Sequence, residues 1–335
     1  MRLEALDFLA CPNCGDFLSL SPNASRADDG HAMAGELACS GCDSRFAIRE
    51  GVPVLLPGSV DAVKTETASR FAKEWLHWSD LRDYYEQEFF AWIAPITAAD
   101  FKDQVVFEGG CGKGRHTAIA ASHGAKAVVS VDLGESAFVA FNHTRGLPNA
   151  HVVIGDLMQP PVRPIFDLAF SVGVLHHLPD PAAGFASLAS RVHPGGRVVL
   201  WVYGAEGNEW ITRYVDPIRT GITSRLPAGF LRVACLLPSA FLWSAIKLFY
   251  RPRAGGKGPM LPYGDYFASM YSYPFDEIHA NVFDQLVTPV AHYLTGDQVR
   301  AWLATGFRDV TVRSHRGYSW TGLATVVGRE AARAS

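Results

Sequence analysis

The stretch that decides the fold is Val105-Val-Phe-Glu-Gly-Gly-Cys-Gly-Lys-Gly-Arg-His-Thr117. A short apolar run ends in the carboxylate of Glu108, and the residues after it include three alternate glycines, Gly110, Gly112 and Gly114. Because glycine has no Cβ and tolerates positive φ, a strand can turn sharply into a helix here while a ligand lies against bare backbone. The pattern therefore predicts a strand, a ligand-binding turn and a helix that begins near Arg115.

Two other glycine-rich motifs do not fit this stretch. The dinucleotide-binding fingerprint needs its last glycine one residue later, where Arg115 stands. A phosphate-binding P-loop is excluded because no glycine stands five residues before Gly112 and because Gly114 follows the lysine. The run instead resembles the first motif of class I S-adenosylmethionine-dependent methyltransferases.

Later landmarks follow in the order of a doubly wound α/β sheet. We expect strands at residues 104–108, 128–132, 151–154, 166–171, 198–203, 309–313 and 326–327. The run Val172 to Pro181 resembles the fourth motif of methyltransferases that act on small molecules, and His193 to Arg197 resembles the turn into their fifth strand. The resemblance covers roughly 104–203 and 295–328, and it implies a Rossmann-like, seven-stranded sheet.

The same resemblance implies S-adenosylmethionine as the cofactor and gives its contacts. These are Glu108, Gly110, Cys111 and Gly112 for the methionine end, Asp132 with Leu133 for the ribose, Asp156 with Leu157 for the adenine, and Ser171 with Val172 near the methyl group. An acid at the end of a second strand is also where a dinucleotide fold holds its ribose. Asp132 has an alternative role as a helix cap for the segment at Ser136. Glu108 stands where aspartate is commoner, which bears on how the cofactor's amino group is held.

Two Cys-x-x-Cys pairs precede this region. Cys11 and Cys14 form one knuckle, and Cys39 and Cys42 form the other. Four thiolates make a closed tetrahedral zinc site with a structural role, and the alternatives are free cysteines or a redox motif. Residues 3–57 resemble the small zinc-ribbon domain that occurs alone as an activating partner of tRNA and protein methyltransferases.

Composition shifts divide the chain into four predicted parts. Residues 1–58 form the zinc ribbon, which ends at Pro57-Gly-Ser, and 59–103 form a helical linker or cap with aromatic side chains at steps of three and four. The methyltransferase domain covers 104–203 and 295–328. Residues 204–294 are too long for a simple connection and are expected to be a mainly helical insertion.

The insertion is expected to cover the cofactor site and to carry the acceptor pocket. Its apolar run 230–250 contains Pro238 and cations, which argues against a membrane span and for a lid, or a helix that rests on lipid or on a second subunit in a homodimer. The aromatic stretch 263–275 has the composition of a pocket wall. Histidine titrates near neutral pH, so the candidate catalytic bases are His176, His177, His279 and His292.

Composition limits the partners and the compartment. The 335 residues are 19% charged with a net charge of −3, so no bulk attraction to nucleic acid is expected. The N-terminal residues lack the long apolar core of a secretory signal, and the cytoplasm is the expected location.

The sequence therefore predicts an S-adenosylmethionine-dependent methyltransferase that acts on a small molecule at oxygen, nitrogen or sulfur, from secondary metabolism or a lipid-like precursor. One alternative is a methyltransferase of RNA or of a translation factor. Another is an interaction protein that binds cofactor without turnover.

Overall fold

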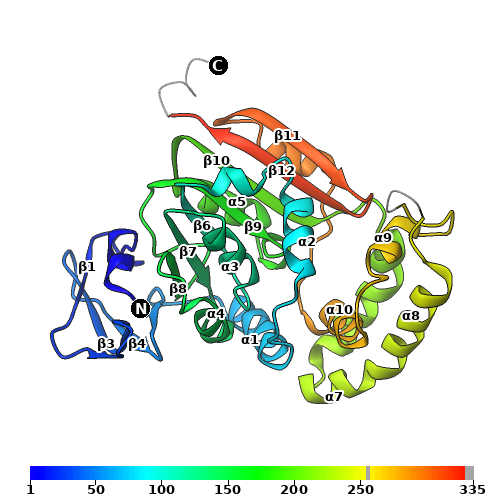
Figure 1. The fold of residues 1–335 in the computed structure, drawn as a ribbon, viewed down its shortest axis with the longest axis horizontal. Helices are drawn as coiled ribbons and strands as arrows, with labels where there is room; N and C mark the ends of the chain where they lie inside the picture. The colour runs from blue at the N-terminus through cyan, green and yellow to red at the C-terminus, as the bar shows by residue number, and fades with distance from the viewer. Residues whose placement is uncertain (254–256, 329–335) are drawn as a thin grey trace.

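A mixed sheet forms the centre of the protein (Figure 1), in a computed structural model that describes residues 1–253 and 257–328. Its central strands lie in the order β8-β7-β6-β9-β10-β12-β11. They are β6 (Val105–Gly109), β7 (Ala127–Asp132), β8 (Ala150–Gly155), β9 (Phe166–Val172), β10 (Val192–Tyr203), β11 (Phe307–His315) and β12 (Ser319–Val326). The strands from β8 to β10 run parallel, whereas β12 is antiparallel to both β10 and β11. The predicted doubly wound, seven-stranded sheet is confirmed, although the strand expected at 326–327 lies earlier, at Ser319–Val326.

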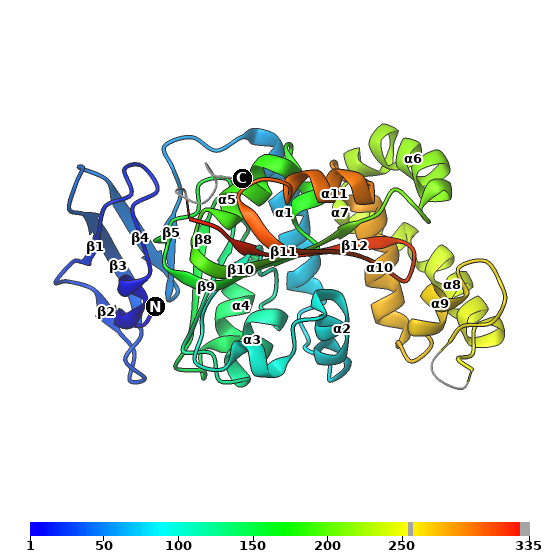
Figure 2. The ribbon, with the colours of Figure 1, turned by 90° about the horizontal axis from the view of Figure 1, so that it is seen from above.

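Helices cover both faces of this sheet (Figure 2). They are α3 (Arg115–Ser122), α4 (Ser136–Thr144), α5 (Pro181–Ala189) and α11 (Gly296–Trp302), with the short turn η3 (Leu175–His177). Successive strand residues point to opposite faces, so Phe107 packs in the core beneath α5 and α11, whereas its neighbour Val106 packs in the core beneath α3 and α2 (Tyr84–Ile93). Both side chains are fully buried.

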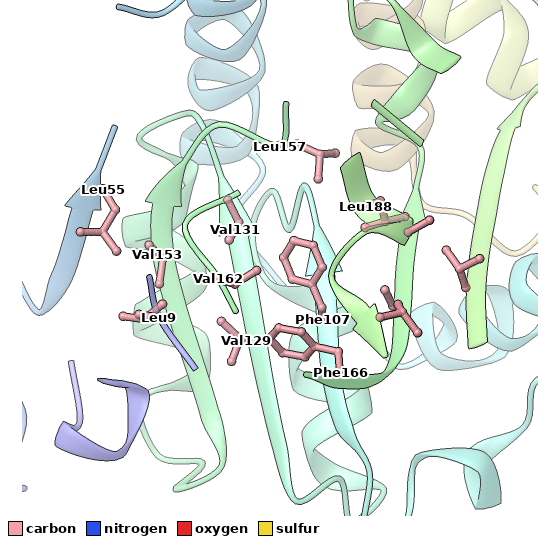
Figure 3. Packing of buried hydrophobic residues seen from close by; sticks show 14 of the residues in the cluster. Leu9, Leu55, Phe107, Val129, Val131, Val153, Leu157, Val162, Phe166 and Leu188 are labelled. Atoms are coloured by element: carbon pink, nitrogen blue, oxygen red, sulfur yellow. The ribbon is translucent and has the colours of Figure 1, made fainter. Parts of the chain in front are cut away.

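The N-terminal unit is joined to the central sheet. It contains η1 (Leu3–Asp7), β1 (Leu18–Leu20), β2 (Ser25–Arg26), β3 (Ala32–Cys39), β4 (Arg45–Arg49) and β5 (Val52–Leu55). Strand β5 pairs in parallel with β8, so that Val54 lies opposite Ile154 and one sheet runs through both units. Leu9 and Leu55 share a hydrophobic cluster with Val153 (Figure 3). The domain boundary predicted at residue 58 stays a prediction. The β-sheet and the hydrophobic core both include residues from either side of it.

The helical linker or cap expected over 59–103 contains separate helices. These are α1 (Ala62–His77), α2 (Tyr84–Ile93) and η2 (Ala98–Phe101). Asp61 begins α1 by accepting hydrogen bonds from the backbone N–H groups of Val63 and Lys64, at 2.9 and 3.0 Å. The chain leaves helical geometry after α1 at Trp78, which has φ −104° and ψ 61°.

The insertion is mainly helical, as predicted. Its elements are η4 (Ile211–Val215), α6 (Asp216–Gly221), η5 (Thr223–Arg225), α7 (Ala228–Ala234), α8 (Leu236–Phe249), α9 (Gly264–Ser269) and α10 (Phe275–Val287). The apolar face of α10 packs against α7 and α8 through Phe283 and Ile278. Among the described residues no single helix could cross a membrane, and only the pair α7 and α8, bent by 41°, has the length and composition to do so.

Candidate cofactor and acceptor cavity

A cavity of about 270 Å³ opens at the carboxyl ends of the parallel strands. One end is lined by the loops after β6, β7 and β8, and the other by β10, α9 and α10. Ligands of doubly wound folds bind at this edge of the sheet. Helix α1 and the insertion lie beside the same edge (Figures 1 and 2), so both contribute walls.

The glycine loop leaves backbone open to this cavity. Gly110 has φ +84°, and a Cβ there would lie 2.3 Å from Cγ2 of Val174. Gly112 has φ +51°, and its Cβ would lie 3.1 Å from Nε1 of Trp75 on α1. Side chains at these positions would be strained and crowded, so the loop fits the expected approach of a ligand to bare backbone.

Asp132 fastens the glycine loop to the next turn. Its Oδ2 accepts a hydrogen bond from the N–H of Gly112 at 2.8 Å. Its Oδ1 accepts from the N–H of Gly134 at 2.9 Å and from the hydroxyl of Ser136 at 3.0 Å. Burial raises the pKa of Asp132, and the side chain lines the cavity beside Leu133. Asp132 thus bonds the side chain of Ser136 and no backbone N–H of α4, whose N-cap is Glu135, so it does not cap that helix, and its side chain lines the cavity.

Asp156 is held by a lysine that the sequence did not single out. Lys64 on α1 forms an ion pair with Oδ2 of Asp156, and Oδ1 accepts a hydrogen bond from the N–H of Met158 at 2.9 Å. Both members of the pair line the cavity, as does Leu157. Lys64 lies in the first turn of α1, after the N-cap Asp61. No sequence pattern shows that this turn lies beside the end of β8.

Two of the expected cofactor residues lie behind the loop instead of in the cavity. Glu108 accepts hydrogen bonds from the hydroxyls of Thr117 and Ser130, at 2.5 and 2.9 Å, and does not line the cavity. Burial raises its pKa to about 7. The hydroxyl of Ser171 donates to the carbonyl of Gly109 at 2.7 Å. These contacts fix β6, β7, β9 and α3 to one another, whereas Cys111 and Val172 do line the cavity.

Of the four histidines expected as bases, His177 lines the cavity. Its Nδ1 lies 2.7 Å from the carbonyl oxygen of Val290, which assigns the ring proton to Nδ1 and leaves Nε2 as an acceptor. Burial lowers its pKa to about 4, so the ring is neutral at pH 7.

The other three histidines lie outside the cavity lining. His176 is buried and stacks on the ring of Tyr203 at a centroid distance of 3.9 Å. His279 directs its Nε2 to the carbonyl oxygen of Arg232 at 2.8 Å, and the N–H of His292 donates to the carbonyl of His176 at 2.8 Å. The structure thus gives the rings of His176 and His279 contacts with the protein around the cavity, whereas the contact of His292 is made by its backbone.

Two cations of the glycine loop hold the helical cap in place, and the sequence reasoning missed both. Nζ of Lys113 donates to the carbonyls of Trp78 and Asp80, each at 2.9 Å, and to the hydroxyl of Tyr85 at 3.0 Å. Burial lowers its pKa to about 8. The guanidinium of Arg115 lies 4.9 Å from the ring centre of Tyr85 and 5.6 Å from that of Trp75. The segment between α1 and α2 is therefore held against the glycine loop.

The far end of the cavity carries a network of hydroxyl, amide and carboxylate groups. Tyr203 donates to Oδ2 of Asp284 at 3.1 Å and accepts from Nε2 of Gln285 at 3.3 Å. The hydroxyl of Tyr85 donates to Glu277 at 3.0 Å. Burial raises the pKa of Asp284 to about 6. This end is therefore polar as well as aromatic, and it can hold a planar ligand with hydrogen-bonding edges.

The four ribbon cysteines form a second, separate cluster. Their Sγ atoms all lie within 4.8 Å of one another. Cys11 and Cys42 are 3.7 Å apart, and Cys14 and Cys39 are 3.4 Å apart. A tetrahedron of sulfur atoms about 2.3 Å from a zinc ion has edges of about 3.8 Å, so the cluster has the size of such a site.

Comparison with known families identifies the central domain. Residues 107–200 match the family model described as "Methyltransferase domain". These residues form a methyltransferase domain. The match spans the methyltransferase domain from β6 into β10, and it confirms the class that the glycine loop and the later landmarks predicted. It also supports S-adenosylmethionine as the cofactor.

Curated relatives of the methyltransferase domain share one name. A "tRNA U34 carboxymethyltransferase" of Pseudoalteromonas translucida is 33% identical over 32% of this chain and 34% of its own. One of Cellvibrio japonicus is 27% identical over 50% of this chain and 56% of its own. This chain thus spans about a third to a half of the relatives it matches. The solved structure "DhpI-SAH complex structure" is 15% identical, with a TM-score of 0.48, over 81% of this chain and all of that one.

The relatives correct two expectations from the sequence. The small-molecule acceptor was wrong, and so was the expectation that nucleic acid is not a partner, because the matched relatives are named for tRNA. The error came from net charge, which averages over the whole surface. Residues 217–264 contain no Asp or Glu but include the cations Arg219, Arg225, Arg232, Lys247, Arg251, Arg253 and Lys257.

Proposed function

We propose that this protein is an enzyme that transfers a methyl group from S-adenosylmethionine, or a carboxymethyl group from its carboxylated analogue, to a uridine of tRNA. The observation that carries the proposal is one continuous cavity with a cofactor end and an acceptor end. Asp132 and Asp156 line the first, and Tyr203 and Asp284 line the second. The names of the curated relatives support tRNA as the acceptor. The assay decides whether the transferred group is methyl or carboxymethyl.

The cofactor end fits an adenosyl sulfonium compound. The open backbone at Gly110 and Gly112 suits the methionine end, and Asp132, which lines the cavity at the end of the second parallel strand, is the proposed acceptor of the ribose hydroxyls. Asp156 is the acceptor for the adenine amine, which would share this carboxylate with Lys64. When bound, the cofactor supplies an electrophilic carbon on a positively charged sulfur, which leaves as a neutral thioether.

The chain's own residues then have three tasks. They align the acceptor with the donor carbon, exclude water and take up the proton that the acceptor loses. Trp75 on α1 and Tyr266 on α9 close the cavity from two sides. Oδ1 and Oδ2 of Asp284 and Nε2 of His177 are the candidate proton acceptors, and the raised pKa of Asp284, about 6, lies nearer to neutral pH. Asp284 is therefore the better matched general base.

We propose further that the cysteine cluster binds one structural zinc ion through Cys11, Cys14, Cys39 and Cys42. A closed set of four thiolates leaves no open coordination position for catalysis. The shared core and the pairing of β5 with β8 connect this unit to the third strand of the methyltransferase domain, whose end carries Asp156. Metal loss should therefore loosen the adenine end of the cavity without removing the cavity itself.

A labelling experiment tests the proposed function. Purified protein is incubated with bulk bacterial tRNA, ribosomal RNA or a tRNA-free cell extract, with S-adenosylmethionine labelled in its methyl group or with its carboxylated analogue. Label is expected in tRNA, and the Asp132→Ala variant is expected to transfer much less. Label in the small-molecule or protein fraction alone would refute the proposal.

A further inference from the structure

The polar face of α10 is turned into the cavity instead of towards solvent. Glu277, Asn281, Asp284 and Gln285 recur at helical spacing and all line it. The opposite face carries Ile278 and Phe283, and other apolar residues, which pack against α7 and α8. A polar helix face that looks inward needs polar partners, because buried polar groups without hydrogen bonds destabilise a protein.

Most of these partners are supplied by the protein itself. Glu277 receives the hydroxyl of Tyr85, and Asp284 receives the hydroxyl of Tyr203. Gln285 donates to Tyr203, and its Oε1 accepts from the hydroxyl of Tyr293 at 3.4 Å. Within residues 1–253 and 257–328, however, the side-chain amide of Asn281 makes no hydrogen bond. It is half-buried, lines the cavity and stands one helical turn from both Glu277 and Asp284.

We propose that Asn281 recognises the Watson–Crick edge of the acceptor uracil. The amide Nδ2–H donates to a ring carbonyl oxygen, and Oδ1 accepts the N3–H beside it, which gives a bidentate pair. This inference rests on the proposed function and names the residue that selects the base. Holding that edge leaves the C5–C6 side of the ring free to face the donor end.

The surroundings of Asn281 fit a flat base taken out of its stack. Tyr266 and Tyr318 line the same cavity and contact each other edge-on, with a centroid distance of 4.5 Å and an interplanar angle of 67°. Enzymes that act on bases commonly stack the extruded base on aromatic side chains and read its edge by hydrogen bonds, so here the base would stack on the open face of one ring and not between the two. Glu277 and Asp284, one helical turn from Asn281 on the cavity face of α10, are carboxyl groups. Asn281 between them supplies a neutral hydrogen-bond donor together with an acceptor.

The test is the Asn281→Asp variant, because a carboxylate cannot donate to a uracil oxygen but accepts from the exocyclic amine of cytosine. Binding is measured by fluorescence anisotropy with two labelled anticodon stem-loop RNAs that differ only in uridine or cytidine at the wobble position. The ratio of affinities, uridine over cytidine, is expected to fall by roughly 5- to 150-fold, the range of one bidentate base contact. Asn281→Ala should weaken uridine binding without favouring cytidine.

The matched control is Asn142→Asp, the same change at an exposed position on α4. It should keep the wild-type ratio, and both variants should bind S-adenosylhomocysteine as the wild type does, which shows that the fold is intact. An unchanged ratio in Asn281→Asp would overturn the inference, and if the wild type still labels tRNA the proposed function stands. If the wild type binds neither RNA and labels no tRNA, both fail together.

Discussion

Replacing Glu108 by glutamine tests how the centre of the fold is built. The carboxyl group is 1% exposed, and burial raises its pKa from an ordinary value near 4.5 to about 7. Between these values the folded protein keeps a proton that the unfolded chain has released, so folding stability falls as pH rises. The difference between the two pKa values corresponds to roughly 3 kcal/mol, at about 1.4 kcal/mol per pH unit.

Glu108→Gln has no titrating group at this position and should not show that loss. Thr117 and Ser130 can rotate their hydroxyls to accept from the new amide, so the fold should survive. We expect the variant to gain about 3 kcal/mol of unfolding free energy relative to wild type between pH 5 and pH 8, within a factor of two.

Urea unfolding followed by tryptophan fluorescence at several pH values gives this quantity. The control is Glu50→Gln, at an exposed glutamate, which should follow the wild type at every pH. If the difference between wild type and Glu108→Gln stayed constant from pH 5 to pH 8, Glu108 would titrate normally. The account of a buried carboxyl behind the glycine loop would then be refuted.

Three further predictions concern the metal, the cofactor and the base. Elemental analysis should find one zinc per chain, and Cys14→Ser should lose it and expose the N-terminal unit to proteolysis; wild-type protein purified without chelator and lacking zinc would contradict this. Asp132→Ala should weaken S-adenosylhomocysteine binding by about 1–3 kcal/mol in calorimetry, because a charged acceptor is lost; equal affinity would mean that the ribose is held elsewhere. Asp284→Asn should slow turnover by roughly 100-fold with cofactor affinity retained, whereas His279→Ala should keep turnover, because its ring bonds a carbonyl outside the cavity; the reverse order would exclude Asp284 as the base.

The sequence was most informative where local pattern and topology agree. The glycine loop, the acid at Asp132 and the Gly155-Asp156 strand end each lie at the carboxyl end of a parallel strand. Short connections and the right-handed crossover rule leave little freedom in how such strands assemble. These motifs, and the family resemblance that they carry, were therefore enough to predict the sheet. The cofactor contacts stay predictions, and two of the residues expected to make them, Glu108 and Ser171, lie behind the glycine loop.

Contacts between distant segments were beyond the sequence. Lys64 on α1 reaches Asp156 at the end of β8, and Lys113 in the glycine loop donates to the carbonyl of Trp78 at the end of α1. Neither pairing has a periodic signal, since each depends on where α1 crosses the edge of the sheet. Residue type was also a poor guide, because His279 was a candidate catalytic base but turns its ring to a backbone carbonyl.

The acceptor was the largest error, and its cause is physical. An aromatic insertion and a weak net charge suggested a small apolar molecule. Tyr203 and Tyr266, however, line the cavity together with Asp284 and Asn281, so the wall is both aromatic and polar. That combination also suits a nucleobase, which has an apolar face and hydrogen-bonding edges.

The most direct test of the central claim is nucleoside mass spectrometry of tRNA from the source organism with the gene deleted. Complementation with the wild-type chain should restore one alkylated uridine, whose mass shows whether the group is methyl or carboxymethyl, and complementation with Asp132→Ala should not. Identical tRNA nucleosides in the deleted and complemented strains would contradict the claim that this protein modifies tRNA.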